Sequence, residues 1–386
     1  MAWGLAALTS GVVYGLLLWP LLPRPGADFK AFYTAARLLA LGGNPYNLGA
    51  LRHMQDALLN RGVSTASVAY YPLDPVANPP LFYWLLGPLT GLPPHTAYII
   101  WTVASAGLTV GALTLLARRL LPQAARRGLL VIAAVLALPH SMVNLIMGQP
   151  DALFLLALAG AALRLERGQP LSAGLLLTVG WIKPHVLLPV GVALLLTERS
   201  WRDLAGVLAG SAAWAAASLL YCPTATLAWI HYLAVDRGSG LLFGAQPTLP
   251  SLLGPLLGRL AAPLSLAVYA MAVLALWIHG QAGNGRRLWA RAAGLTALWL
   301  ALAPYLHLND GLLVALPLLL LTPIAVANRG TALTVLLVTT LLGLYLLPLA
   351  NLWLGVAPAL NVLPLLGLAA ALWVARREIM APVPGG

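Results

Sequence analysis

Charged side chains are rare in this sequence, so the few that interrupt its apolar segments are the first candidates for chemistry. Asp28, Lys183 and Asp310 adjoin long apolar stretches, and Lys183 is one of only two lysines among 386 residues. A charged residue at membrane depth costs at least about 2.5–3.5 kcal/mol on insertion scales, which makes it a functional candidate by default. A carboxylate can accept a proton from a reacting hydroxyl, and a cation can stabilise an anionic group. The sequence therefore points to acid–base or anion-binding chemistry.

Each candidate also has a structural explanation. Asp28 could simply cap a helix that begins at the next residue, and the long side chain of Lys183 could extend to the membrane interface without a catalytic task. His307 and Asp310 could form no more than a turn and an N-cap. Asp151 precedes a short apolar segment, where an acid interacts favourably with the helix dipole, so capping is its simpler interpretation.

The composition identifies the elements that must position these residues. Hydrophobic residues make up 60% of the chain and charged residues 8%, and the mean hydropathy is +0.86. Soluble domains carry roughly 25% charged residues. Apolar runs long enough for membrane helices, about 20 residues each, recur throughout. We expect an all-α, polytopic integral membrane protein in which residues 1–386 form a single domain.

The basic residues give the orientation. The formal net charge is +12, but these residues lie in short clusters between apolar runs, which argues against a partner nucleic acid. We expect about twelve transmembrane helices, some short or re-entrant: 3–22, 95–117, 128–147, 151–164, 170–182, 185–198, 203–221, 261–279, 288–304, 310–328, 331–349 and 357–375. With both termini in the cytoplasm, the inner face carries fourteen arginines and four acids, against eight basic and six acidic residues outside. The positive-inside rule thus favours this orientation. We expect a multi-pass protein of the cell (plasma) membrane. The first segment, without a basic n-region, is expected to be a retained helix.

This topology gathers the unusual polar residues outside the cytoplasm. Six of the seven histidines and six aspartates fall at or near the outer face: His53, His95, His140, His185, His231, His307, Asp28, Asp56, Asp74, Asp151, Asp236 and Asp310. The segments 151–164, 170–182 and 185–198 are too short for ordinary straight spans. Half-length, proline-broken segments are tolerated where protein or a water-filled cavity satisfies their backbone, so we expect a cavity open to the outside.

Two long outer loops, 23–94 and 222–260, interrupt the helices. In the first, the apolar spacing predicts an amphipathic helix over Phe29–Leu41 that lies flat at the membrane surface. Asn47–Arg61 predicts a second short helix, and Leu81–Leu92 a re-entrant or interfacial segment.

Several short motifs carry a resemblance to a known family. In order, they are Asp28-Phe-Lys-Ala-Phe-Tyr-Thr-Ala-Ala-Arg37, Gly42-Gly-Asn-Pro-Tyr46, Asn78-Pro-Pro-Leu81 with Pro88-Leu89, Gly148-Gln149, the run from Ala173-Gly174 to Lys183-Pro184, and Pro304-Tyr-Leu-His307. Each is short and degenerate, and the specificity lies in their order and topology over most of residues 1–330. The sequence resembles glycosyltransferase family 87, whose members are polyprenyl-phosphate-sugar-dependent enzymes of the GT-C fold.

The resemblance implies transfer of a sugar, most often mannose or a pentofuranose, from a lipid-linked monophosphate to a hydroxyl acceptor outside the cytoplasm. The expected partners are the lipid bilayer, a polyprenyl-phosphate-sugar donor and a glycolipid or glycan acceptor. No cofactor is expected, because the lipid-linked sugar phosphate is a co-substrate.

Roles for individual residues follow from this implied reaction. Asp28 is the expected catalytic base, since it directly follows the first helix and would lie at the membrane surface beside the donor phosphate. The expected phosphate-binding residues are Lys183, His307, Arg37 and Arg237. The candidate substrate-binding residues are Asp310, Gln149, His185 and Tyr33.

Other chemistries have weaker support. The sequence has no Asp-x-Asp pair, no His-Glu-x-x-His, no Gly-x-Gly-x-x-Gly and no P-loop, so we expect metal independence and no cytoplasmic nucleotide-sugar donor. The rival class is a lipid or small-molecule transporter or flippase, because transporters also use broken helices. A non-catalytic scaffold is the third class, but it would not require His, Asp and Lys on one face.

Overall fold

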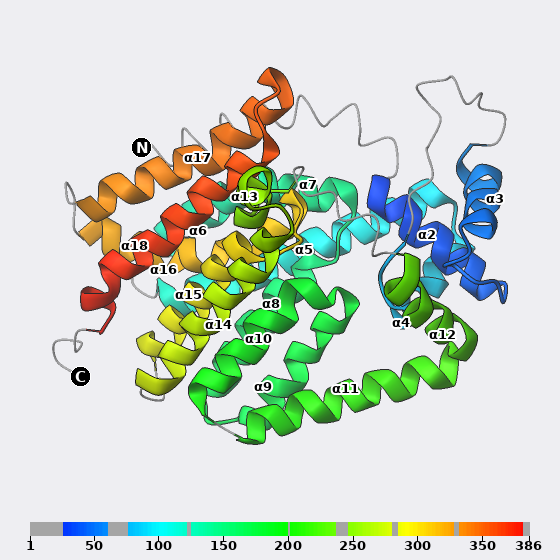
Figure 1. Cartoon of the computed structure of the whole chain (residues 1–386), viewed down its shortest axis with the longest axis horizontal. Helices are drawn as coiled ribbons and strands as arrows, with labels where there is room; N and C mark the ends of the chain where they lie inside the picture. The colour runs from blue at the N-terminus through cyan, green and yellow to red at the C-terminus, as the bar shows by residue number, and fades with distance from the viewer. Residues whose placement is uncertain are drawn as a thin grey trace.

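A computed structural model of the chain describes residues 26–60, 76–121, 125–199, 201–236, 246–279, 285–327 and 332–380. All regular structure in these ranges is helical (Figure 1). The α-helices are α2 Ala27–Ala40, α3 Leu48–Leu59, α4 Pro80–Leu86, α5 Pro94–Leu120, α6 Ala125–Leu136, α7 Pro139–Met147, α8 Asp151–Glu166, α9 Pro170–Leu177, α10 Pro184–Glu198, α11 Trp201–Tyr221, α12 Pro223–His231, α13 Leu249–Leu257, α14 Ala261–His279, α15 Arg286–Leu302, α16 Ala315–Ala327, α17 Ala332–Leu354 and α18 Val362–Met380. Shorter helical turns are η2 Gly87–Gly91, η3 Thr178–Ile182, η4 Tyr232–Asp236, η6 Gly258–Leu260, η7 Leu308–Val314 and η8 Pro358–Asn361.

Four helices in the described ranges are long and apolar enough to cross a membrane: Pro94–Leu120, Trp201–Tyr221, Leu249–His279 and Pro358–Arg376. Shorter apolar helices cover Pro170–Ile182, Pro184–Glu198, Leu308–Ile324 and Ala332–Pro348. The all-helical membrane class is therefore confirmed, whereas the count of about twelve spans stays a prediction.

The short segments predicted from the sequence are short in the structure. Helix α8 has 16 residues, which at 1.5 Å per residue is about 24 Å and less than a bilayer core of about 30 Å. Helices α9 and α10 are shorter still, and the turn η3 connects α9 to Lys183, the residue before α10.

The single helix predicted over 128–147 is wrong, because α6 ends at Leu136 and α7 begins at Pro139. The ring of Pro139 disfavours a helical conformation in the residue before it, and Leu138 is indeed extended, with ψ 140°. Proline itself is well tolerated in the first turn, so the chain starts a new helix there. The predicted helix 3–22, together with Asp74 and Arg237, lies outside the described residues.

Helices α2, α3, α4 and α12 gather at one end of the molecule, and α14 to α18 lie at the other (Figure 1). The predicted helices at Phe29–Leu41 and Asn47–Arg61 correspond to α2 and α3. The predicted segment Leu81–Leu92 is a helix and a 3-10 turn, α4 and η2. Tyr46 and Trp229 tie this end together, because they donate hydrogen bonds to the backbone carbonyls of Asn78 (2.7 Å) and Ala77 (2.9 Å).

Glycines allow α9 and α11 to approach closely. A Cβ on Gly174 would lie 2.2 Å from the Asp203 carbonyl oxygen, and one on Gly206 would lie 2.3 Å from that of Leu171. Small residues at helix interfaces permit such backbone contact in membranes, where packing rather than the hydrophobic effect holds helices together. Trp181 of η3 also donates a hydrogen bond to Ser211 of α11 (2.8 Å). Helix α11 therefore fixes the turn that leads to Lys183.

Candidate functional site

The start of α2 docks on the turn between α7 and α8. Gly26 is required there, because a Cβ would lie 1.8 Å from the Ile146 carbonyl oxygen. Gly148 ends α7 with φ +74°, a conformation that glycine adopts without strain. Two side chains of α5 hold the turn from the other side: Tyr98 donates to Ile146 O (2.8 Å) and Trp101 to Gly148 O (2.8 Å). The contact brings Asp28 of α2 next to Gln149.

Gln149 bridges an acid and a cation. Its Nε2 donates to Asp28 Oδ2 (2.6 Å), and its Oε1 accepts from Lys183 Nζ (3.0 Å). Because a carboxylate only accepts and an ammonium only donates, this amide orientation satisfies both partners. Gln149 is buried, so the bridge is shielded from bulk solvent. Residues 28, 149 and 183 are thus connected through side chains alone.

The same lysine continues the chain of contacts to η7. Lys183 Nζ forms an ion pair with Asp310 Oδ1, and Asp310 is fully buried. Asp310 Oδ2 accepts from the backbone N–H of His307 (2.7 Å), as expected of a residue that caps the turn. The exposed His307 shares a hydrogen bond between its Nε2 and the hydroxyl of Tyr305 (2.7 Å). The Tyr305 ring meets His185 edge to face, with 5.2 Å between ring centroids.

Two hydrogen bonds to backbone carbonyls hold the segment around Lys183. Asn78 Nδ2 donates to Ile182 O (2.9 Å), which connects the Asn-Pro-Pro motif of the first loop to the residue before the lysine. Trp299 of α15 donates to His185 O (2.9 Å) at the beginning of α10. The lysine therefore lies at a junction of α4, η3, α10 and α15.

The structure gives Asp28 a role other than helix capping. It lies in the first turn of α2, Gly26 is the N-cap, and the hydrogen-bond partner of the carboxylate is Gln149. Burial raises the pKa of Asp28 above its usual range, and this effect outweighs the opposing effects of the Gln149 hydrogen bond and of Lys183. A carboxylate with a raised pKa is a stronger general base than an ordinary aspartate.

Not all predicted site residues join these contacts. Arg37 follows Asp28 by nine residues, which puts it on roughly the opposite side of a helix with 3.6 residues per turn. It donates instead to Thr90 O (3.3 Å), and Tyr33 donates to Leu92 O (2.7 Å), so both anchor α2 to η2 and the residue after it. Arg237 lies outside the described residues.

Several polar residues of the site were not predicted as such. Asn78 was part of a motif, and its position beside Lys183 could have been suspected from it. Asn144 had no sequence signal, yet its Nδ2 donates to Asp151 Oδ2 (2.5 Å) and to Asn309 O (2.9 Å). Asp151 is fully buried, and its hydrogen bond runs to this side chain rather than to the helix backbone.

Within the described ranges, no group of three or more His, Cys, Asp or Glu side chains is arranged to hold a metal ion. Metal independence stays a prediction.

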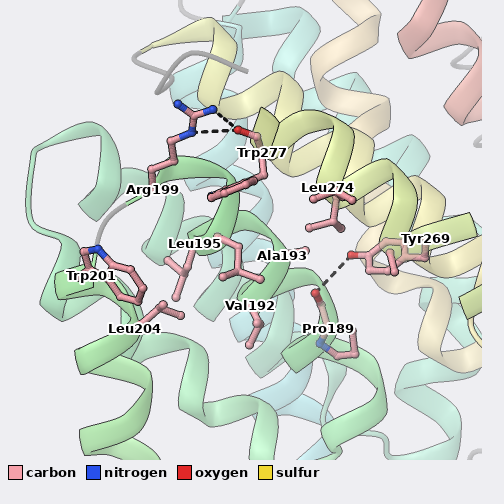
Figure 2. A pocket seen from close by; sticks show the side chains of 13 residues that line it. Pro189, Val192, Ala193, Leu195, Arg199, Trp201, Leu204, Tyr269, Leu274 and Trp277 are labelled. Atoms are coloured by element: carbon pink, nitrogen blue, oxygen red, sulfur yellow. Dashed lines mark hydrogen bonds between the residues drawn. The ribbon is translucent and has the colours of Figure 1, made fainter. Parts of the chain in front are cut away.

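A large pocket lies away from these polar contacts, at the opposite end of α10. It has a volume of about 620 Å³ and lies between α10, α14 and the start of α11. Its walls are almost wholly apolar and include Pro189, Ala193, Leu274 and Trp277 (Figure 2). Arg199 stands at one end, where it donates hydrogen bonds to the Trp277 carbonyl oxygen.

Comparison with known proteins supplies one match. The model of a family described as Glycosyltransferase family 87 matches residues 77–304, more than half of the chain. No curated protein and no solved structure matches the sequence. The matched range includes Asn78, Gln149 and Lys183 but ends before His307 and Asp310.

Proposed function

The chain belongs to glycosyltransferase family 87 and is a membrane glycosyltransferase, and from this premise we propose that it transfers a sugar from a polyprenyl-phosphate-linked donor to an extracytoplasmic glycolipid or glycan. Mannose is the leading candidate for the sugar. The family makes the chain an enzyme, so the transporter and scaffold alternatives are set aside.

The proposed reaction is a single displacement with Asp28 as the base. The acceptor oxygen forms a bond to the anomeric carbon while the bond from that carbon to the phosphate oxygen breaks. The bonding electrons leave with the lipid phosphate, and the hydroxyl proton passes to Asp28. Because the acceptor attacks opposite the leaving group, the anomeric configuration inverts.

One observation carries the proposal: Gln149 joins Asp28 to Lys183, with distances of 2.6 Å and 3.0 Å. General-base catalysis requires a carboxylate near the attacking hydroxyl, and departure of the phosphate requires a nearby cation. Gln149 donates its hydrogen bond to Asp28 Oδ2, and no described residue donates one to Oδ1. Oδ1 is therefore suited to accept the hydroxyl proton. Lys183 Nζ has three hydrogens and two partners here, which leaves one hydrogen for a phosphate oxygen.

Further residues support binding of the leaving group. His307 is exposed, while Lys183 and Asp310 are buried. Of these three side chains, His307 is therefore the one that a substrate reaches first. We assign it to the donor phosphate. His185, whose ring contacts Tyr305, belongs in this proposal to the sugar or the acceptor.

The proposed topology is a GT-C-like bundle of about twelve spans in the cell membrane, with both termini in the cytoplasm. Its support is the distribution of arginine between the two faces. In this orientation the site faces the extracytoplasmic side, where a polyprenyl-linked sugar is accessible.

The direct test uses purified protein with radiolabelled polyprenyl-phosphate-mannose and crude envelope lipids. Wild type should transfer label to a new lipid, and Asp28→Asn should reduce the rate by 10²–10⁴-fold, the usual contribution of a general base. Asp56→Asn is the matched control, since Asp56 is on the neighbouring helix α3, where it interacts with Arg52 and Asn60.

The outcomes separate the parts of the proposal. Equal transfer by wild type and Asp28→Asn would remove Asp28 as the base. Transfer from a pentofuranose donor, but not from the mannose donor, would correct the sugar and keep the mechanism.

A further inference from the structure

A buried polar network lies behind the Lys183–Asp310 pair. Asn144 of α7 is its centre, because one amide group donates to Asp151 of α8 (2.5 Å) and to the Asn309 carbonyl of η7 (2.9 Å). Asn309 directly precedes Asp310, and Asp151 follows Gln149 by two residues. The network therefore links both segments that supply partners to Lys183.

Asp151 adds a third carboxyl group around one ammonium. Lys183 interacts electrostatically with Asp151 and Asp28 as well as with Asp310. Asp151 is completely buried, so ionising its carboxyl group has a desolvation cost, which the ammonium of Lys183 partly offsets. The hydrogen bond of Asp151 runs to Asn144, which also holds the backbone of Asn309 beside Asp310.

Part of the network has no hydrogen-bond partner among the described residues. Among the described residues, five of its fully buried polar atoms lack a hydrogen-bond partner: His140 Nδ1 and Nε2, Asn144 Oδ1, Asp151 Oδ1 and Asn309 Nδ2. His140 belongs to the same place, because a Cβ on Gly311 of η7 would lie 2.1 Å from its ring. Unsatisfied buried polar groups destabilise a fold, and proteins retain them mainly where function needs them.

We propose that Asp151 is a positioning residue of the transfer reaction, which, together with Asn144, holds Lys183 and Asp310 in place for the donor phosphate without touching either substrate. This rests on the proposed function of the Asp28–Gln149–Lys183 site. Loss of the Asp151 charge lets the lysine shift but also removes a negative charge near the phosphate. Turnover therefore falls while donor affinity does not.

The test is Asp151→Asn, which keeps the size of the side chain and can still accept from Asn144. We expect kcat to fall at least tenfold, the KM for the polyprenyl-phosphate-sugar to stay equal or decrease, and the unfolding temperature to stay equal or rise. Asp203→Asn is the matched control, since Asp203 is also fully buried but lies on α11 against Gly174 of α9. It should leave kcat unchanged.

Three results would overturn the inference. An unchanged kcat in Asp151→Asn would remove any role in the reaction. A raised donor KM with unchanged kcat would indicate direct substrate contact. A fall in kcat that accompanies an equal fall in stability, also seen in Asp203→Asn, would indicate a merely structural carboxyl group. In each case the wild-type rate still reports separately on the proposed function.

A second measurement needs no turnover at all. The unfolding temperatures of wild type, Asp151→Asn, Lys183→Met and the double variant form a double-mutant cycle. If Asp151 acts through Lys183, Asp151→Asn should stabilise the Lys183→Met protein more than it stabilises wild type, because the carboxyl groups there lack their counter-ion. Additive effects would show that Asp151 does not act through Lys183 and would overturn the inference.

Discussion

The two ends of α10 differ in polarity: the candidate functional site lies at one end and an apolar pocket at the other. At the first end, Lys183 and Asp310 form a buried ion pair within a chain of polar contacts. At the other end, the pocket of about 620 Å³ is lined almost entirely by apolar side chains (Figure 2). In a protein surrounded by lipid, an apolar hollow needs no special explanation, whereas buried charges are costly and must be explained. The polar end is therefore where chemistry is expected, although the pocket of about 620 Å³ lies at the other end.

The strongest challenge to this comparison is to remove the ion pair. Lys183→Met should reduce sugar transfer by about 100-fold or more, the scale on which loss of one transition-state contact acts. It should also destabilise the fold by roughly 3–5 kcal/mol, because Asp310 is left buried without its counter-ion. Rates and unfolding temperatures measure the two effects.

The double variant Lys183→Met/Asp310→Asn distinguishes the loss of sugar transfer from the loss of stability. It removes both charges of the pair, so stability should return in part while transfer stays low. Recovery of stability is incomplete because Asp151 remains buried without its counter-ion. Recovery of transfer together with stability would mean that the pair is only structural.

The pH dependence of the transfer rate tests whether Asp28, at the polar end, is the base. The proposed base works only when deprotonated, and burial raises the pKa of Asp28. The rate should therefore decline as pH decreases, beginning at a higher pH than for an ordinary aspartate, by about tenfold per pH unit below that pKa. The acid limb of kcat/KM against pH measures this.

Gln149→Met should move the acid limb to higher pH, because the hydrogen bond from Gln149 lowers the pKa of Asp28. An acid limb at the same pH in both proteins would assign it to another group.

A smaller effect is expected where the first loop supports the lysine. Asn78→Ala removes the hydrogen bond to Ile182 O. Such a bond contributes about 1 kcal/mol, so a misplaced Lys183 should reduce kcat roughly fivefold. Asn60→Ala is a suitable control, because Asn60 follows α3 directly and donates a side-chain hydrogen bond to Asp56 of that helix. Equal rates in the two variants would contradict a positioning role for Asn78.

The smallest effect is expected at the apolar end. Ala270→Phe narrows the pocket from α14, a helix that supplies none of the site residues. Transfer should stay within about twofold of wild type, since an exposed substitution of this kind usually changes stability by less than about 0.5 kcal/mol. A tenfold loss with stability unchanged would break the comparison, because the pocket would then participate in the reaction.

Part of the site was predictable from rarity and motif. Asp28, Lys183 and Asp310 were identified because charges among apolar residues need a reason, and Gln149 because it follows Gly148 in a motif. Arg37 and Tyr33 are predicted site residues because they belong to the motif from Asp28 to Arg37 and because the resemblance implies a phosphate and a sugar to bind. Helical phase alone would have put Arg37 on the other side of α2, and the structure gives it Thr90 as a partner.

Other features depended on contacts that the sequence does not specify. The bridging role of Gln149 and the network around Asn144 require α2, α7, α8 and η7 to meet. The break at Pro139 did have a local signal, but the continuous apolar pattern of 128–147 obscured it.

Composition by itself determined that this chain is helical and belongs in a membrane. The reason is local, because lipid offers no hydrogen bonds and each apolar segment must satisfy its own backbone. Tertiary structure alone decided which polar side chains meet. Apolar helix surfaces are alike, so their pairing depends on close fits such as Gly26 against Ile146 and Gly174 against α11, and these fits bring residues 28, 149, 183 and 310 together.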